Sequence, residues 1–140
     1  MNTEKSIDDR IDPDNPTQLI HADETYAVVG AAMEVYYKLG TGFLEYVYQQ
    51  ALAVELSRRN IPFVEQRRFS IDYKGVILEK EYVADFVCYG KIIIEIKALS
   101  QLSTIEWAQV INYLKVSHMR VGLLFNFGSS GRLEWKKFVI

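Results

Sequence analysis

The segment Ile92-Ile93-Ile94-Glu95-Ile96-Lys97 constrains the fold of this chain more than any other. So many consecutive apolar residues are typical of a strand that is covered on both faces of a sheet. Residues 121–127 form a second continuous apolar run, which is consistent with another buried strand. Two strands of this kind indicate a sheet with helices packed against it, and thus an α/β fold.

The rest of the chain alternates between helical and strand periodicity. Amphipathic spacing predicts helices over residues 23–38, from residue 44 to residue 58, and from Ser103 or Thr104 to about residue 117. Strand patterns predict six strands, over residues 63–73, 76–78, 82–89, 91–97, 121–127 and 133–140, the last at an edge. We therefore expect a single α/β domain with a mixed central β-sheet flanked by helices.

Composition excludes several classes of protein. The apolar runs are far shorter than the about 20 residues that a membrane helix needs. With Cys88 as its one cysteine, the chain has no internal disulfide and no cysteine-based zinc site. The first 14 residues are polar and acidic, unlike a signal peptide, so we expect a cytoplasmic protein. Residues 1–18 are poor in apolar side chains and predict a flexible tail before a domain over residues 19–140.

The formal charge of −2 is unevenly distributed. Residues 1–18 hold five acids and two bases, a net charge of −3, whereas the remaining 13 acids and 14 bases give +1. The basic residues of the body include the pairs Arg58-Arg59, Arg67-Arg68 and Lys136-Lys137. A near-neutral body with local basic pairs is compatible with phosphate contacts but does not require them.

Charged residues stand out in the isoleucine-rich strand. Strand alternation places Glu95 and Lys97 on the same face. If Gly90 is the centre of a hairpin turn, Asp85 lies opposite Glu95, and one of these facing carboxyl groups should have a raised pKa. A divalent cation between them would relieve the repulsion, and oxygen ligands suit Mg²⁺ or Mn²⁺. The plain alternative is that the strand is leaving the core and Lys97 simply reaches solvent.

Two predicted helices carry further polar groups that could contribute to such a site. Glu45 lies in the first turn of its helix, with Tyr48 three residues later on the same face. Gln109 and Tyr113 lie one turn apart on the helix that follows the isoleucine-rich strand. These residues also have ordinary structural interpretations. Glu45 would be an acid that interacts with the helix dipole, Tyr48 a core aromatic residue, and Gln109 a solvated surface group.

These residues resemble known family motifs. The segment Gly42-Phe43-Leu44-Glu45-Tyr46-Val47-Tyr48 is similar to the signature of the GxxExxY protein family. Asp85, the run Glu95-Ile96-Lys97 and the run Gln109-Val110-Ile111-Asn112-Tyr113 resemble the PD-(D/E)XK nuclease superfamily, including the QxxxY element of its RecB-like branch. The resemblance spans residues 23–140. One departure is Ala84, which precedes Asp85 at a position where the superfamily motif has proline.

The resemblance implies a restriction-endonuclease-like αβββαβ core with an extra N-terminal helix. It implies a divalent-metal-dependent phosphodiesterase acting on DNA, with single-stranded or branched DNA among the substrates. The implied ligands of Mg²⁺ or Mn²⁺ are Asp85, Glu95 and the carbonyl of Ile96, and Glu45 completes the shell or helps to hold a second ion.

The resemblance also implies roles for three other side chains. Lys97 would orient or deprotonate the attacking water and stabilise the charge that develops on the phosphate. Gln109 and Tyr113 would position the phosphate or the water by hydrogen bonding. Two alternatives stay open, a nucleic-acid-binding module without catalysis and a protein-interaction module. The sequence also leaves the oligomeric state open, with a homodimer among the alternatives.

Overall fold

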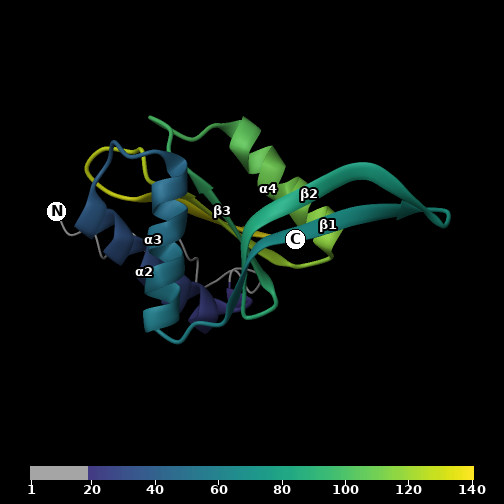
Figure 1. The fold of residues 1–140 in the computed structure, drawn as a ribbon, viewed down its shortest axis with the longest axis horizontal. Coiled ribbons are helices and arrows are strands. Elements are labelled where there is room, and N and C mark those ends of the chain that lie inside the picture. Colours follow the sequence, from purple (N-terminus) through teal and green to yellow (C-terminus); the bar gives the residue numbers. More distant parts are fainter. Residues whose placement is uncertain (1–18) are drawn as a thin grey trace.

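The computed structural model describes residues 19–140, so the predicted flexible tail lies outside the described residues (Figure 1). Its helices are α2 (Ala22–Leu39), α3 (Glu45–Arg58) and α4 (Thr104–Ser117). Its strands are β1 (Phe63–Tyr73), β2 (Val76–Cys88), β3 (Ile92–Lys97), β4 (Val121–Asn126) and β5 (Glu134–Val139). The three helices were all predicted, with ends within two residues of the expected positions.

The strands form one five-stranded sheet in the order β1-β2-β3-β4-β5. Neighbouring strands are antiparallel except β3 and β4, which are parallel, so the sheet is mixed as expected. The parallel pair is joined through α4, a crossover of the kind that parallel strands require. The predicted edge position of the last strand is confirmed.

Helices cover both faces of the sheet. One apolar cluster joins α2 and α3 to β3 and β4, through residues such as Val28, Leu52 and Ile94. A second cluster joins α4 to the opposite face, through Val110 and Leu114. Burial on both faces explains why β3 and β4 are so apolar, since every residue of β4 is buried. In residues 19–140 no helix combines the length and the apolar character needed to cross a bilayer.

The prediction of six strands is wrong at one place. The expected strands 76–78 and 82–89 are a single strand, β2, which continues through the charged residues Glu79, Lys80 and Glu81. These residues are exposed, and Glu81 still pairs with Ser70 of β1. Because this part of the hairpin faces solvent, a charged run does not end the strand.

The outer part of the β1–β2 hairpin, residues 67–82, extends well beyond the rest of the molecule, and we call it the hairpin arm (Figure 1). Its tip carries exposed apolar side chains, among them Tyr73, Val76 and Ile77. The base of the arm is anchored by α4, since Phe69 packs against the α4 cluster. α4 therefore packs against both the central strands and the base of the hairpin arm.

Local signals set the start of α4 as expected. The hydroxyl of Ser103 accepts a hydrogen bond from the N–H of Ile105, and the carboxylate of Glu106 accepts one from the N–H of Ser103, which makes a capping box. The buried residues of this helix are Val110 and Leu114. Trp107 is 38% exposed, and Nζ of Lys136 lies 5.0 Å from its ring centre.

Candidate active site

The turn at Gly90 brings two acidic residues together. The pairs Phe86↔Ile94, Val87↔Ile93 and Cys88↔Ile92 have the register that was assumed for Asp85 and Glu95. Beyond these pairs the regular ladder ends, and Oδ2 of Asp85 accepts a hydrogen bond of 2.7 Å from the N–H of Ile96. The carboxyl group of Asp85 thus takes the place of a backbone acceptor at the point where β2 and β3 separate.

The carboxyl groups of Asp85 and Glu95 are hydrogen-bonded to each other. Burial raises the pKa of Glu95 to about 9, and the nearby charge of Asp85 adds to this effect. Burial also raises the pKa of Asp85, against the hydrogen bond from Ile96. Glu95 is 5% exposed, and its Oε1 is buried without a hydrogen-bond partner. The pair therefore holds a proton at neutral pH, as expected for two facing carboxyl groups.

Gln66 is a neighbour of Asp85 that the sequence did not single out. The β1–β2 register places the two residues opposite each other, and the side chain of Gln66 hydrogen-bonds to the carboxylate. The backbone of Gln66 is left-handed, with φ of +51°, and interrupts the extended conformation of β1 at this point. Because glutamine in an exposed strand is common, no sequence pattern distinguishes it.

A pocket of ≈ 330 Å³ lies between β3, β2 and α4, and it contains four of the predicted site residues. Its lining consists of Lys80, Tyr82, Glu95, Lys97, Ala108, Gln109, Asn112 and Tyr113. Glu95 and Lys97 thus share a face, as alternation predicted, and this face is the one that α4 covers. Lys80 and Tyr82 were not predicted as site residues; Lys80 fell in the expected break of β2, and Tyr82 began the expected strand that carries Asp85.

Tyr113 is held by the backbone of the neighbouring strand. Its hydroxyl donates a hydrogen bond of 3.0 Å to the carbonyl oxygen of Val83. Burial raises the pKa of Tyr113 to about 12, and the carboxyl groups of Glu95 and Asp85 act in the same direction. The hydroxyl therefore keeps its proton and connects α4 to β2, whereas the side chain of Gln109 is exposed at the pocket.

Tyr48 fixes the loop that leads to Glu45. The buried hydroxyl of Tyr48 donates to the carbonyl oxygen of Gly40 at 2.6 Å and accepts from the N–H of Phe43 at 3.2 Å. Its ring stacks on Phe127, with ring centres 4.7 Å apart. These contacts determine where α3 begins, and Glu45 is its first residue.

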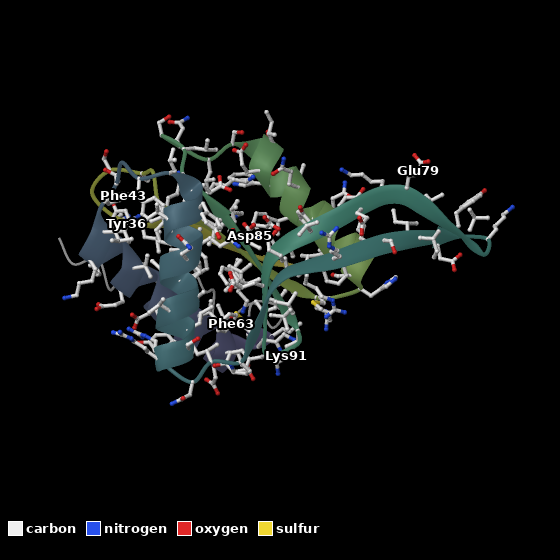
Figure 2. The ribbon with its side chains drawn as sticks, in the orientation of Figure 1. Tyr36, Phe43, Phe63, Glu79, Asp85 and Lys91 are labelled. Carbon is white, nitrogen blue, oxygen red and sulfur yellow. The ribbon has the colours of Figure 1, made fainter. Side chains whose placement is uncertain are left out.

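Glu45, the first residue of α3, interacts electrostatically with Asp85 but is not part of the acidic pair. Burial raises the pKa of Glu45, the ammonium of Lys97 lowers it, and the charge of Asp85 raises it. Within residues 19–140, no three carboxylate, imidazole or thiol side chains lie close enough together to hold one metal ion. Figure 2 shows Asp85 at the base of the β1–β2 hairpin and Glu79 farther out on the same strand.

The segment after Lys97 is held in place by β4. The carboxamide of Asn126 accepts from the N–H of Leu99 at 2.8 Å and donates to the carbonyl of Leu99 at 2.9 Å. A Cβ on Gly128 would lie 2.3 Å from this carbonyl oxygen, so the two backbones approach as closely as glycine permits. Asn126 was missed as a supporting residue, although an amide at the end of a buried apolar strand is a recognisable signal.

Comparisons with known proteins agree with this geometry. A family model described as the PD-(D/E)XK nuclease superfamily matches residues 22–138. The crystal structure of SSO0001 is similar in fold, with a TM-score of 0.56 and 16% sequence identity. The similarity covers 86% of this chain, which spans 60% of the length of that one. No curated protein matches the sequence. Since the family model spans most of its length, the chain belongs to the PD-(D/E)XK nuclease superfamily.

Proposed function

We propose that the chain is a divalent-metal-dependent phosphodiesterase that hydrolyses DNA. The observation that carries this proposal is the Asp85–Glu95 pair, two buried carboxyl groups in direct contact. In the absence of a cation such a pair is unfavourable, because neither burial nor the neighbouring acid allows both groups to ionise. Oε1 of Glu95 is an unsatisfied buried acceptor of the kind that a metal ion can satisfy.

The donor atoms fit a hard cation. The carboxylates of Asp85 and Glu95 and the carbonyl oxygen of Ile96 would hold Mg²⁺ or Mn²⁺, which prefer oxygen ligands. Mg²⁺ commonly keeps several water ligands and takes only one or two protein carboxylates, so a third acid is not required. A bound cation supplies positive charge that favours ionisation of water and offsets the charge on the phosphate.

The other residues have roles that follow from their positions. Lys97, on the same face as Glu95, orients the attacking water and, as an ammonium, stabilises charge on the reacting phosphate. Gln109, exposed at the pocket, donates a hydrogen bond to the phosphate or the water. Tyr113 acts by positioning α4 against β2. The charges of Lys97 and Asp85 act on Glu45, and we assign this carboxylate to orienting the ammonium or helping to hold a second ion.

The decisive experiment is cleavage of labelled single-stranded, duplex and branched DNA by the full chain. We expect cleavage with Mg²⁺ or Mn²⁺ and none with EDTA. Asp85→Asn, Glu95→Gln and Lys97→Met should each reduce the rate by at least about 100-fold, equivalent to about 2.7 kcal/mol of transition-state stabilisation. Glu79→Gln removes an exposed carboxylate from the same strand as Asp85 and is the matched control (Figure 2).

Two outcomes would overturn the proposal. Cleavage that persists in EDTA, or that survives both carboxylate substitutions, would place the chemistry elsewhere or in a contaminant. DNA binding in EDTA with no cleavage by any divalent ion would make the chain a binding module that retains the nuclease fold. No observation on residues 19–140 supports the homodimer.

A further inference from the structure

The pocket beside the acidic pair is the size of a small ligand. At ≈ 330 Å³ it lies at the lower end of the range of about 300–1,000 Å³ that is typical of small-molecule sites. Glu95 and Lys97 lie on its β3 side, and α4 and β2 form the other two sides. A phosphodiester at the acidic pair therefore has an adjoining nucleotide within reach of this pocket.

The β2 side of the pocket is an aromatic ring held between neighbours. Nζ of Lys80 lies 5.2 Å from the ring centre of Tyr82. The ring of Tyr113 meets Tyr82 edge to face, at 5.7 Å and 80° between planes, and the Tyr113 hydroxyl is tied to the adjacent Val83 carbonyl. Tyr82 is half-buried and lines the pocket, so the part of its ring that faces the pocket can contact a nucleobase, and its neighbours already order it.

The α4 side of the pocket presents carboxamides. Gln109 and Asn112 both line it and both are exposed. Each carries a donor and an acceptor, the combination that can hydrogen-bond to the edge of a base. In a duplex these edges face the pairing partner, whereas an unpaired base leaves them accessible.

The positive charge near the pocket is suited to a short stretch of nucleic-acid backbone. Lys80 and Lys97 supply two ammonium groups at the pocket. Farther along the hairpin arm, Arg68 forms an ion pair with Glu81 at 3.2 Å. Together with the formal charge of −2, this pairing argues against a long track of phosphate contacts along a duplex.

We propose that this pocket binds one unpaired nucleotide of a DNA strand, with its base against Tyr82, the edge of the base at Asn112, and its phosphates near Lys80, Lys97 and Gln109. The inference rests on the proposed function, which it deepens by naming single-stranded DNA as the substrate class. Tyr82 and Lys80 are then substrate-binding residues contributed by the hairpin arm.

The test is a binding assay in EDTA, which excludes cleavage, with a labelled single-stranded oligothymidylate of about ten residues. Its competitors are an abasic strand of the same length, a duplex and thymidine monophosphate. We expect the intact strand to bind at least 5-fold more tightly than each competitor. Since base–aromatic stacking corresponds to about 5- to 150-fold in affinity, Tyr82→Leu should weaken strand binding by this factor, and Tyr82→Phe should restore it.

The chain offers a matched control. Tyr73→Leu also removes a tyrosine from the hairpin whose ring carries a lysine, because Nζ of Lys74 lies 5.6 Å from the Tyr73 ring centre. Tyr73 is 59% exposed at the tip of the arm and outside the pocket, so its loss should leave affinity unchanged. The affinity should also fall with salt at a log–log slope of about −1 to −2, as expected for two phosphates of a single strand.

The outcomes separate the two proposals. If the abasic strand or the duplex binds as tightly as oligothymidylate, or if Tyr82→Leu and Tyr73→Leu behave alike, the nucleotide pocket is wrong, even when Mg²⁺-dependent cleavage is present. If thymidine monophosphate binds as tightly as the strand, the ligand is a free nucleotide and the inference also fails. Tyr82-dependent binding without any metal-dependent cleavage supports the pocket and overturns the nuclease.

Discussion

Glu95 is an acid whose ionisation opposes folding. Its pKa rises from 4.5 to about 9 when burial beside Asp85 disfavours the charged form. Between these values the folded state binds a proton that the unfolded state has released, so the free energy of unfolding falls as pH rises. Below this window the group is neutral in both states and the penalty is absent. The acidic pair thus lowers the stability of the metal-free protein at neutral and alkaline pH.

The first prediction is a pH-dependent stability that depends on this residue. In EDTA, the free energy of unfolding should decrease between about pH 5 and pH 9, with a slope of up to about 1.4 kcal/mol per pH unit from this group. Glu95→Gln should flatten the dependence and be more stable than wild type at pH 8. Urea denaturation at several pH values measures both effects.

Glu79→Gln is the control for this measurement, because Glu79 is exposed on the same strand as Asp85. Its pH dependence should follow that of the wild type. If Glu95→Gln keeps the wild-type slope, or is less stable than wild type at pH 8, then Glu95 is ionised in the folded protein and forms a stabilising ion pair with Lys97 instead.

At the scale of elements, α4 contributes both a substrate contact and a support. Gln109 is exposed at the pocket, whereas Tyr113 holds the helix to β2 through Val83. The second prediction is that Gln109→Ala reduces DNA cleavage by about 10- to 1,000-fold, or about 1.4 kcal/mol for each factor of ten. Its melting temperature and its affinity for Mn²⁺ should stay at the wild-type values. Cleavage at the wild-type rate would show that the QxxxY resemblance has no functional content here.

Tyr113→Phe should behave differently, and it forms the third prediction. The substitution removes the hydrogen bond to Val83 and leaves a carbonyl without its donor, which should cost about 0.5–1.5 kcal/mol of unfolding free energy. Because β2 also carries Asp85, cleavage should fall together with stability. Chemical denaturation and cleavage rates, measured on the same preparation, test whether stability and cleavage fall together. Unchanged stability would contradict the prediction.

The fourth prediction concerns two glycines that sit in opposite surroundings. Gly128→Ala places a Cβ 2.3 Å from the carbonyl oxygen of Leu99, so the backbone must move. This should lower the free energy of unfolding by about 1–3 kcal/mol. Gly30→Ala, inside α2, meets only the end of the Arg59 side chain at 3.3 Å and should stabilise the helix by about 0.5–1 kcal/mol. Denaturation curves of both variants measure the difference, and a stable Gly128→Ala protein would contradict the close approach.

Helices and buried strands could be predicted from the sequence because their periodicity reflects local burial. The start of a helix at Ser103 or Thr104 and the apolar run of β4 were predicted from signals of this kind, and both are confirmed. The continuity of β2 through Glu79 was not predicted, since pairing with β1 in the hairpin, and not local composition, keeps that segment extended.

The candidate site could also be predicted in part, as far as local patterns determine it. A turn centred on Gly90 gave the correct register, and alternation gave the shared face of Glu95 and Lys97. The contact of Gln66 with Asp85 depends on the left-handed backbone of Gln66 within the β1–β2 pair, and that of Tyr113 with Val83 depends on the packing of α4 against β2. No local pattern in the sequence encodes either. Tertiary geometry thus determines the surroundings of the acidic pair.

In the molecule as a whole, the acidic pair lies where several layers meet. β2 contributes Asp85 and β3 contributes Glu95, while α3 brings Glu45 from one side and α4 lines the pocket on the other. None of these side chains is held near the others in an unfolded chain. A cation at the pair therefore binds the folded state almost exclusively, and its binding energy adds to global stability.

The fifth prediction follows from this linkage. A divalent cation at 100 times its dissociation constant should raise the free energy of unfolding by about 2.7 kcal/mol. Because the proton on Glu95 must leave before its carboxylate can bind a cation, the stabilisation should grow as pH rises, opposite to the trend of the metal-free protein. Thermal melts with Mg²⁺ or Mn²⁺ against EDTA at pH 6.5 and pH 8.5 test both the size and the sign. Glu79→Gln should keep the full effect and Asp85→Asn should lose it; an equal effect in Asp85→Asn would mean that the cation binds elsewhere.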